Sequence, residues 1–426
     1  MNSSDLINLL QDRNIFLSGG AGVGKSYLTN EIISQYEKNG KNVIPLGSTG
    51  ISAVNIGGYT LHSFFVFGIA KDIEELKSYD KRNKKRVNEL KKILKETDLI
   101  IIDEISMVSS ALMDMIYYRL FSLGFAGKLM VVGDFYQLPP IVKKDSKNSL
   151  FKEEVYAFES SSWEKFDFYP VILSEVKRTT NKEFAYILEK IRKGICDSEV
   201  KSYLASLKET KLINSSDATY LFGRNAEADS MNKKRLLELN SDENFYYWSI
   251  NNIAKVNEKR LESWSKNLPI NEILHLKVGA KVIFSVNSWG KYVNGQKGVV
   301  VEVDNEHIVV RSKGRDINVT QHDFELSEID SQTLENKVVA TISQYPLKLA
   351  YAITIHKSQG MSLDSLVCNL DYLFAPNQLY VAISRATDPK YLKIEYSRGD
   401  FNSYLSRVIV QNSVVDEFYR SLGCED

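Results

Sequence analysis

The stretch "FLSGGAGVGKSYLT", from Phe16 to Thr29, restricts the possible folds of this chain more than any other. Residues 19–25 hold four glycines and a lysine. The run "NIFLSG" before them predicts a buried strand, and "SYLTNEIISQYEKNG" after them predicts an amphipathic helix. Because glycine costs backbone entropy, such a turn serves either a tight structural corner or the close approach of a ligand. The spacing G-x-x-x-x-G-K-S is the phosphate-loop pattern, which favours a ligand.

We therefore predict that this loop binds a nucleotide together with a magnesium ion. Lys25 is expected to reach the terminal phosphates, and Ser26 is expected to bind the metal. The residues expected to hold the nucleotide run along the loop and into the helix: Gly19, Gly20, Ala21, Gly22, Val23, Gly24, Lys25, Ser26 and Tyr27.

Length and composition exclude several other classes of protein. A chain of 426 residues should hold more than one core, since single cores stop growing at about 250–300 residues. The formal net charge of zero argues against a large nonspecific polyanion-binding surface but permits a local basic groove. The three cysteines are far apart, which argues against a disulfide scaffold and a zinc site. Without a long apolar window or a signal-peptide pattern, we expect no membrane span and a cytoplasmic location, at the nucleoid if the source is bacterial.

The predicted secondary structure changes twice along the chain, from an α/β pattern to a β pattern and back. Residues 1–173 alternate apolar strands with helical patterns, as an α/β domain does, with a small insertion at about 55–96. Part of this insertion, "KDIEELKSYDKRNKKRVNELKKILKETD", predicts one charged helix, either a solvated face or a nucleic-acid contact. Residues 276–339 predict a small antiparallel barrel or sandwich. They interrupt a second α/β domain, formed by residues 174–275 and 340–426.

The run "LIIIDEISM" predicts a buried strand that ends in Asp103 and Glu104. After a phosphate loop, this placement puts Asp103 on the magnesium ion and Glu104 beside the terminal phosphate, where it orients or deprotonates the attacking water. In isolation, the same pair reads equally well as two solvated acids at a strand end.

Three further polar residues are candidates for contacting the terminal phosphate during hydrolysis. Gln137, in "VVGDFYQLPPI", can bond both a water and a phosphate oxygen, although this segment taken alone is a turn. Arg178 in "LSEVKRTT" and Arg385 in "YVAISRAT" suit the stabilisation of charge on a transferred phosphoryl group. For either arginine alone, a surface salt bridge is the commoner role.

The order of these motifs resembles one helicase family. The series is "GGAGVGKS", "GSTGISAVNIGGYTLHSFF", "IIDEISM", "GDFYQLPP", "LSEVKRT", "YAITIHKSQGMSLD" and "LYVAISRAT". It resembles the Pif-one (petite integration frequency) family, in the 5′-to-3′ branch of the superfamily 1 DNA helicases. The resemblance covers residues from about 13 to about 395. It implies an α/β fold with two RecA-like P-loop motor domains, ATP and Mg²⁺ between them, and an SH3-like β-barrel at 276–339.

The resemblance also implies residue roles. Lys25 and Ser26 bind phosphate and metal, Gln137 senses the γ-phosphate, and Arg178 and Arg385 are arginine fingers. Gly360, in "HKSQG", belongs to the motif that couples the second motor domain to ATP and DNA. The family's adenine-reading glutamine has one counterpart here, Gln11, which is closer to the phosphate loop than the family pattern has it.

Single-stranded DNA is the partner that two coupled motor domains would grip, through phosphate contacts and base stacking. The expected contacts come from one motif in each domain: Thr49, His62, Ser63 and Phe64 in the first, and Thr354, His356, Lys357 and Ser358 in the second. Taken individually, Phe64 is more often a core residue and His62 more often a structural one.

Together these features predict an ATP-dependent 5′-to-3′ DNA helicase. It would act on single-stranded, forked or structured DNA, and no residue selects among forks, G-quadruplexes and RNA–DNA hybrids. We expect a monomer in solution, and the sequence does not indicate the oligomeric state on DNA. The alternative is a DNA-stimulated ATPase that tethers or remodels DNA without processive unwinding, since it would keep the same ATP residues.

Overall fold

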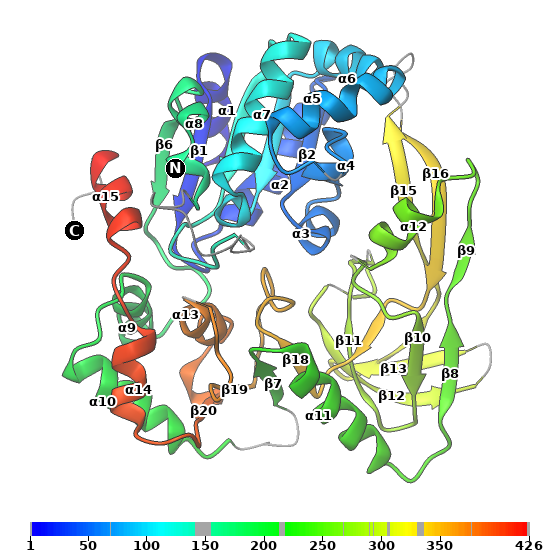
Figure 1. The fold of residues 1–426 in the computed structure, drawn as a ribbon. Coiled ribbons are helices and arrows are strands. Elements are labelled where there is room, and N and C mark those ends of the chain that lie inside the picture. The colour runs from blue at the N-terminus through cyan, green and yellow to red at the C-terminus, as the bar shows by residue number, and fades with distance from the viewer. Residues whose placement is uncertain are drawn as a thin grey trace.

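The fold has three parts, two α/β units one above the other and a β-rich part beside them (Figure 1). The computed structural model describes residues 2–423, except 69, 141–154, 213–217, 267, 289, 293, 305–306, 330–335 and 376. No helix in these described ranges is both long enough and apolar enough to span a membrane.

The first unit is built on a parallel sheet with the order β3-β2-β4-β5-β1-β6. Its strands are β1 (Ile15–Gly19), β2 (Val43–Gly47), β3 (Tyr59–Thr60), β4 (Leu99–Asp103), β5 (Lys128–Val132) and β6 (Tyr169–Leu173). Along β4, Leu99 and Ile101 pack into one core, while Ile100 and Ile102 pack into another on the opposite face. The prediction of a sheet buried on both faces is therefore confirmed.

Helices cover both faces of this sheet. They are α1 (Ser3–Asp12), α2 (Lys25–Lys38), α3 (Gly50–Asn55), α4 (Leu61–Phe64), α5 (Ile73–Arg82), α6 (Lys84–Glu96), α7 (Ser110–Leu123) and α8 (Ser161–Lys165). The prediction of one charged helix in the insertion is wrong, because α5 and α6 are separate. The chain leaves helical geometry at Asn83, whose side-chain amide donates to the Tyr79 carbonyl oxygen over 3.0 Å. A side chain that bonds the local backbone in this way competes with the helix.

The second unit has a parallel sheet with the order β18-β7-β19-β20. Its strands are β7 (Thr219–Phe222), β18 (Ala352–Thr354), β19 (Leu366–Asn369) and β20 (Leu392–Glu395). The helices of this segment are α9 (Lys182–Arg192), α10 (Ser198–Lys208), α11 (Asn225–Leu237), α13 (Gln378–Ile383) and α14 (Phe401–Val408). Residues on both sides of the β-rich part thus form one sheet, as an interrupted domain requires.

The β-rich part begins earlier than the sequence predicted. Its main sheet, β14-β13-β12-β11-β17, is antiparallel and comprises β11 (Lys281–Phe284), β12 (Lys297–Val303), β13 (Ile308–Ser312), β14 (Arg315–Val319) and β17 (Leu347–Leu349). Beside it lie β8 (Asn244–Tyr247), β9 (Ser249–Asn251), β10 (Ile273–Leu276), β15 (His322–Ile329), β16 (Asn336–Gln344) and α12 (Glu258–Ser265). Because β8 pairs with β10 and β9 pairs with β16, residues 244–276 join this part rather than the second unit. Exposed Phe245 and Tyr247 hide the strand alternation in the sequence.

The last helix, α15 (Ser413–Ser421), also departs from the prediction. The sequence assigned residues 340–426 to the second domain, but Val415 and Tyr419 pack into the core of the first unit with Phe16 and Phe135. Figure 1 shows α15, in red, returning beside β6 and β1. The amphipathic pattern of a helix predicts that one face is buried and says nothing about which core buries it.

Candidate nucleotide and DNA site

The glycine loop leaves β1 at the carboxyl edge of the sheet and enters α2 at Lys25. Gly19, Gly22 and Gly24 have φ angles of 139°, 79° and 95°. A Cβ atom on Gly19 would lie 2.2 Å from the carbonyl oxygen of Leu173, so only glycine fits there. Lys25 Nζ donates to the carbonyl oxygens of Gly19 and Gly20, over 2.7 and 2.9 Å. Backbone and ammonium group thus gather where a phosphate chain would bind.

Asp103 and Glu104 lie at the same edge, because β4 and β1 are parallel strands of one sheet, and only β5 lies between them. Glu104 has left-handed backbone angles, φ 55° and ψ 50°, and its N–H donates to Asp103 Oδ1 over 2.9 Å. Burial and the charge of Glu104 raise the pKa of Asp103 to about 7. Burial also raises the pKa of Glu104, against the effect of Lys25 and Arg385. Two adjacent carboxylates with little access to water favour a nearby cation.

The donor set fits a magnesium ion. Ser26 and Asp103 both line the cavity described below, and both offer the oxygen ligands that Mg²⁺ prefers. Within the described residues, no group of three or more His, Cys, Asp or Glu side chains could hold a metal. Mg²⁺ commonly takes only one or two protein ligands beside phosphate oxygens and water, so these two side chains suffice.

Of the two predicted arginine fingers, Arg178 contacts the phosphate loop and also the residue next to Arg385. The N–H groups of Lys177 and Arg178 both donate to the Gly22 carbonyl oxygen, over 2.8 and 3.1 Å. Arg178 Nη1 donates to the carbonyl oxygen of Ser384, the residue before Arg385, over 2.8 Å. Burial, with the charge of Arg385, lowers the pKa of Arg178 to about 9. Burial and mutual repulsion disfavour two positive charges here, so a bound anion would stabilise both guanidinium groups.

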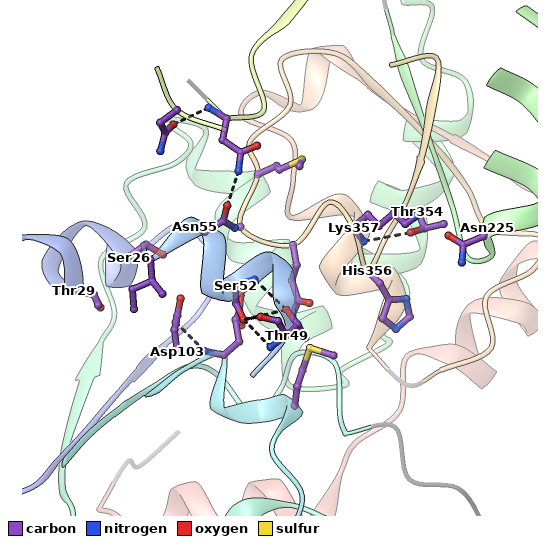
Figure 2. A pocket seen from close by; sticks show the side chains of 18 of the residues that line it. Ser26, Thr29, Thr49, Ser52, Asn55, Asp103, Asn225, Thr354, His356 and Lys357 are labelled. Atoms are coloured by element: carbon purple, nitrogen blue, oxygen red, sulfur yellow. Dashed lines mark hydrogen bonds between the residues drawn. The ribbon is translucent and has the colours of Figure 1, made fainter. Parts of the chain in front are cut away.

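A cavity of about 670 Å³ connects the phosphate edge with the second unit. The expected site residues that line it are Ser26, Thr49, Asp103, Glu104, Thr354, His356, Lys357 and Gly360. Figure 2 shows α3 between the two groups, with Ser26 and Asp103 on one side and His356 and Lys357 on the other. The structure therefore brings Ser26, Asp103 and Glu104 to one space with half of the candidate DNA residues. We name it the interdomain cavity.

Four of the eight expected DNA contacts line this cavity: Thr49, Thr354, His356 and Lys357. Thr49 caps α3, with its hydroxyl oxygen accepting from Ser52 N. Thr354 Oγ1 accepts from Lys357 N over 3.3 Å. The ring of His356 stacks on Phe374 at a centroid distance of 6.0 Å, and Phe374 is 62% exposed. Phe374 thus adds an aromatic surface that the sequence motifs did not point to.

The other four expected DNA contacts do not line the cavity. Phe64 is buried in the core of the first unit, in ring contact with Phe65 at 5.0 Å. Ser358 is fully buried, and its hydroxyl donates to the Ile355 carbonyl oxygen. In this structure both are structural residues, which corrects the prediction. His62 is exposed, and Ser63 lines a separate small pocket beside α6.

Gln11 is not near the phosphate loop. It is exposed in the last turn of α1, and the carbonyl oxygen of its neighbour Asp12 accepts from Lys128 Nζ at the start of β5. Gln11 therefore lies at the amino edge of the sheet, while the loop lies at the carboxyl edge. Strand β1 has five residues, so about 16 Å separates these edges at about 3.3 Å per residue. The prediction that Gln11 binds the nucleotide is not supported.

Other expected residues take mixed positions. Tyr27 is 66% exposed, outside the interdomain cavity, and its hydroxyl donates to Glu31 over 2.7 Å. Gln137 is buried, and its main-chain carbonyl oxygen accepts from the side-chain amide of Asn377, which precedes α13. Sequence reasoning missed Tyr380, whose hydroxyl accepts from Ala21 N in the phosphate loop over 2.8 Å. A tyrosine in the apolar helix α13 gives no signal that distinguishes it from a core residue.

Comparisons with known proteins agree with this geometry. The model of the PIF1-like helicase family matches residues 4–202, and a second model, described as Helicase, matches residues 305–400. The ATP-dependent DNA helicase Pif1 of Campylobacter jejuni is 42% identical over 97% of this chain and 96% of that protein. The chain belongs to the Pif1 helicase family.

Solved Pif1 structures confirm the expected fold. The structure of Bacteroides sp Pif1 with ADP-AlF4 matches with a TM-score of 0.82 and 30% identity, over 99% of this chain and 96% of that one. Bacteroides Pif1 with ADP-AlF3 and ssDNA matches with a TM-score of 0.69 and 30% identity, over 99% and 97%. The resemblance to the Pif1 family that the motifs indicated is thereby confirmed. The SH3-like character of the β-rich part stays a prediction.

Proposed function

We propose that this chain is an ATP-dependent DNA helicase that moves 5′-to-3′ along single-stranded DNA and unwinds the duplex ahead of it. One observation carries the proposal: the interdomain cavity joins Asp103 and Glu104 to His356 and Lys357. Residues suited to phosphoryl transfer and residues suited to a nucleic-acid strand therefore share one space between two units. A change in the separation of the units would act on both.

The residues of the chain have distinct parts in the hydrolysis step. ATP supplies the phosphoanhydride bond. Ser26 and Asp103 would hold Mg²⁺, which would offset the negative charge of the phosphates. Glu104 orients the attacking water and accepts its proton, since a pKa raised by burial suits a base near neutral pH. Arg385, from the second unit, stabilises charge on the transferred group only when the two units are together. Hydrolysis would thereby be tied to the position of the second unit.

Strand polarity tests the function. Wild-type protein with ATP should unwind a duplex that carries a 5′ single-stranded tail and leave a 3′-tailed duplex intact, in a fluorescent strand-separation assay. Lys25→Ala, which removes the phosphate-binding ammonium group, is the inactive control. Hydrolysis that DNA stimulates without any strand separation would favour the alternative, a tethering or remodelling ATPase.

Salt dependence tests the proposed strand contact at Lys357. On single strands the slope of log K against log salt is about −0.7 for each phosphate that the protein neutralises. Lys357→Ala should therefore weaken the binding of an oligothymidine and make the slope shallower by about 0.7, the value for a single phosphate. Lys41→Ala is the matched control, because Lys41 is exposed and contacts the Tyr36 ring outside the cavity. An unchanged slope in Lys357→Ala would remove Lys357 from the strand path.

A further inference from the structure

A buried ion pair joins the two units beside the phosphate loop. Asp134 follows β5 and is fully buried. Its two carboxylate oxygens accept from Arg192 Nε and Arg192 Nη2, both over 2.9 Å. Arg192 is the last residue of α9, in the second unit, and Glu189 accepts from its Nη1. A Cβ atom on Gly20 would lie 3.6 Å from Arg192 Cδ, so this arginine packs directly against the loop.

A tyrosine hydroxyl from the C-terminal helix completes the surroundings of Asp134. Tyr419 Oη lies 2.6 Å from Ser18 Oγ, 3.2 Å from Phe135 N and 3.4 Å from Asp134 Oδ1. One arrangement satisfies all three contacts: Ser18 and Phe135 donate to Tyr419, and Tyr419 donates to Asp134. Burial and the charge of Asp134 raise the pKa of Tyr419, so the hydroxyl keeps its proton. Ser18 precedes the first glycine of the loop, so this hydroxyl ties the loop's strand to β5.

Ring stacking fixes the same residues in place. The rings of Tyr136 and Tyr419 are stacked, with centroids 5.0 Å apart and an angle of 9° between planes. The guanidinium group of Arg192 lies 4.6 Å from the centroid of the Tyr136 ring. The hydroxyl of Tyr136 donates to Asp416, in the middle of α15, over 2.7 Å. Helix α15 is thus attached to the first unit by polar contacts as well as by its apolar face.

The charge of Asp134 lies close enough to the phosphate loop to affect nucleotide binding. Burial lowers the pKa of Lys25, and the charge of Asp134 opposes this shift. The charge of Asp134 also acts on Glu104, whose pKa burial raises. An unpaired carboxylate at this place would repel the phosphates that the loop is built to bind. A bidentate guanidinium neutralises it and holds it in one orientation. Removing one partner of a buried pair leaves the other charge uncompensated.

We propose that Arg192 and Tyr419 are positioning residues for nucleotide binding. Because Tyr419 lies on α15, this helix would then contribute to nucleotide affinity. Arg192, from the second unit, neutralises Asp134 and holds it in one orientation through its bidentate contact. Tyr419 fixes the strand end from which the phosphate loop begins. This inference rests on one part of the proposed function, that the phosphate loop binds a nucleotide, and does not require DNA unwinding.

Two conservative variants test it, each with a matched control. Tyr419→Phe keeps the ring and removes the hydroxyl, and Arg192→Lys keeps the charge and removes the bidentate fork. Tyr404→Phe removes an equally buried hydroxyl that donates to the Leu370 carbonyl oxygen, inside the second unit. Arg119→Lys breaks another buried bidentate pair, with Asp80, whose partners are all outside the loop. All four variants are expected to lower Tm.

Nucleotide affinity separates positioning from stability. The Kd for a fluorescent ADP analogue should rise about tenfold in Tyr419→Phe and Arg192→Lys, the effect of about 1.4 kcal/mol. It should stay within about twofold of wild type in the two controls, the scatter expected of unrelated sites. KM for ATP should rise with Kd, while kcat at saturating ATP changes little.

The outcomes are distinct from those of the proposed function. Wild-type affinity in Tyr419→Phe and Arg192→Lys, with Tm lowered as in the controls, would overturn the inference and reduce both residues to structural ones. Nucleotide binding that responds as expected, in a protein that unwinds no DNA, would overturn the proposed function alone. A wild-type protein that binds no nucleotide would overturn both.

Discussion

Replacing Arg385 by alanine should lower kcat for DNA-stimulated ATP hydrolysis by about 10³–10⁵-fold, the range for loss of an arginine finger. Arg385 is 2% exposed, and its Nε donates to the Val381 carbonyl oxygen over 2.9 Å. Its position is thus fixed by α13 before any nucleotide binds. Burial lowers the pKa of Arg385, and the charge of Glu104 opposes that shift. The guanidinium group is therefore buried in the second unit, near enough to Glu104 for the two charges to interact.

Two companion variants make this result specific. Arg385→Lys keeps the charge without the planar fork, so its kcat should fall between those of Arg385→Ala and wild type. Arg407→Ala removes an exposed arginine of α14 in the same unit and should hydrolyse ATP like wild type. Steady-state hydrolysis with saturating oligothymidine measures kcat, and circular dichroism checks that each variant is folded. A folded Arg385→Ala protein with kcat within tenfold of wild type would exclude Arg385 as the finger.

The sequence could predict the residues at the carboxyl edge of the first sheet because each group of them belongs to one short stretch of the chain. A glycine loop between a strand and a helix needs a positive φ at Gly22 and Gly24, and no other residue type supplies it as readily. Asp103 and Glu104 follow a strand of the same parallel sheet, whose carboxyl ends meet at one edge. Strand order within the sheet did not have to be known for these groups to be placed together.

The wrong predictions concern burial and position in space, both of which depend on packing between distant segments. Phe64 and Ser358 belong to the expected motifs, yet their side chains turn into the two cores. Gln11 was a candidate as the one glutamine that precedes the phosphate loop, and the chain direction through α1 and β1 places it at the opposite edge of the sheet. Helix α15 returns to the first unit because Tyr419 finds partners 285 residues away, at Asp134. No period in the sequence encodes such a contact.

Replacing Glu104 by glutamine should lower kcat by about 10²–10⁴-fold, the usual contribution of a general base. Glutamine has nearly the same shape, so the variant should still bind a fluorescent ATP analogue with Mg²⁺. Its amide cannot accept the proton of the attacking water. Single-turnover hydrolysis measures the chemical step directly, and Glu31→Gln, at a side chain that bonds Tyr27 outside the cavity, is the matched control. Near-normal turnover in Glu104→Gln would show that another group activates the water.

The same variant makes a prediction about pH. Burial and the charge of Glu104 together raise the pKa of Asp103 to about 7, so in wild type the metal ligand takes up a proton as the pH falls through that value. Mg²⁺-dependent nucleotide affinity should therefore weaken below about pH 7 in the free protein. In Glu104→Gln the neighbouring charge is absent, only burial raises the pKa, and the loss of affinity should shift to lower pH. Titrations of the fluorescent analogue with and without Mg²⁺, from pH 5.5 to 8.5, measure this shift. A midpoint that is the same in both proteins would mean that Asp103 does not sense Glu104, and that the two carboxylates do not share one cation.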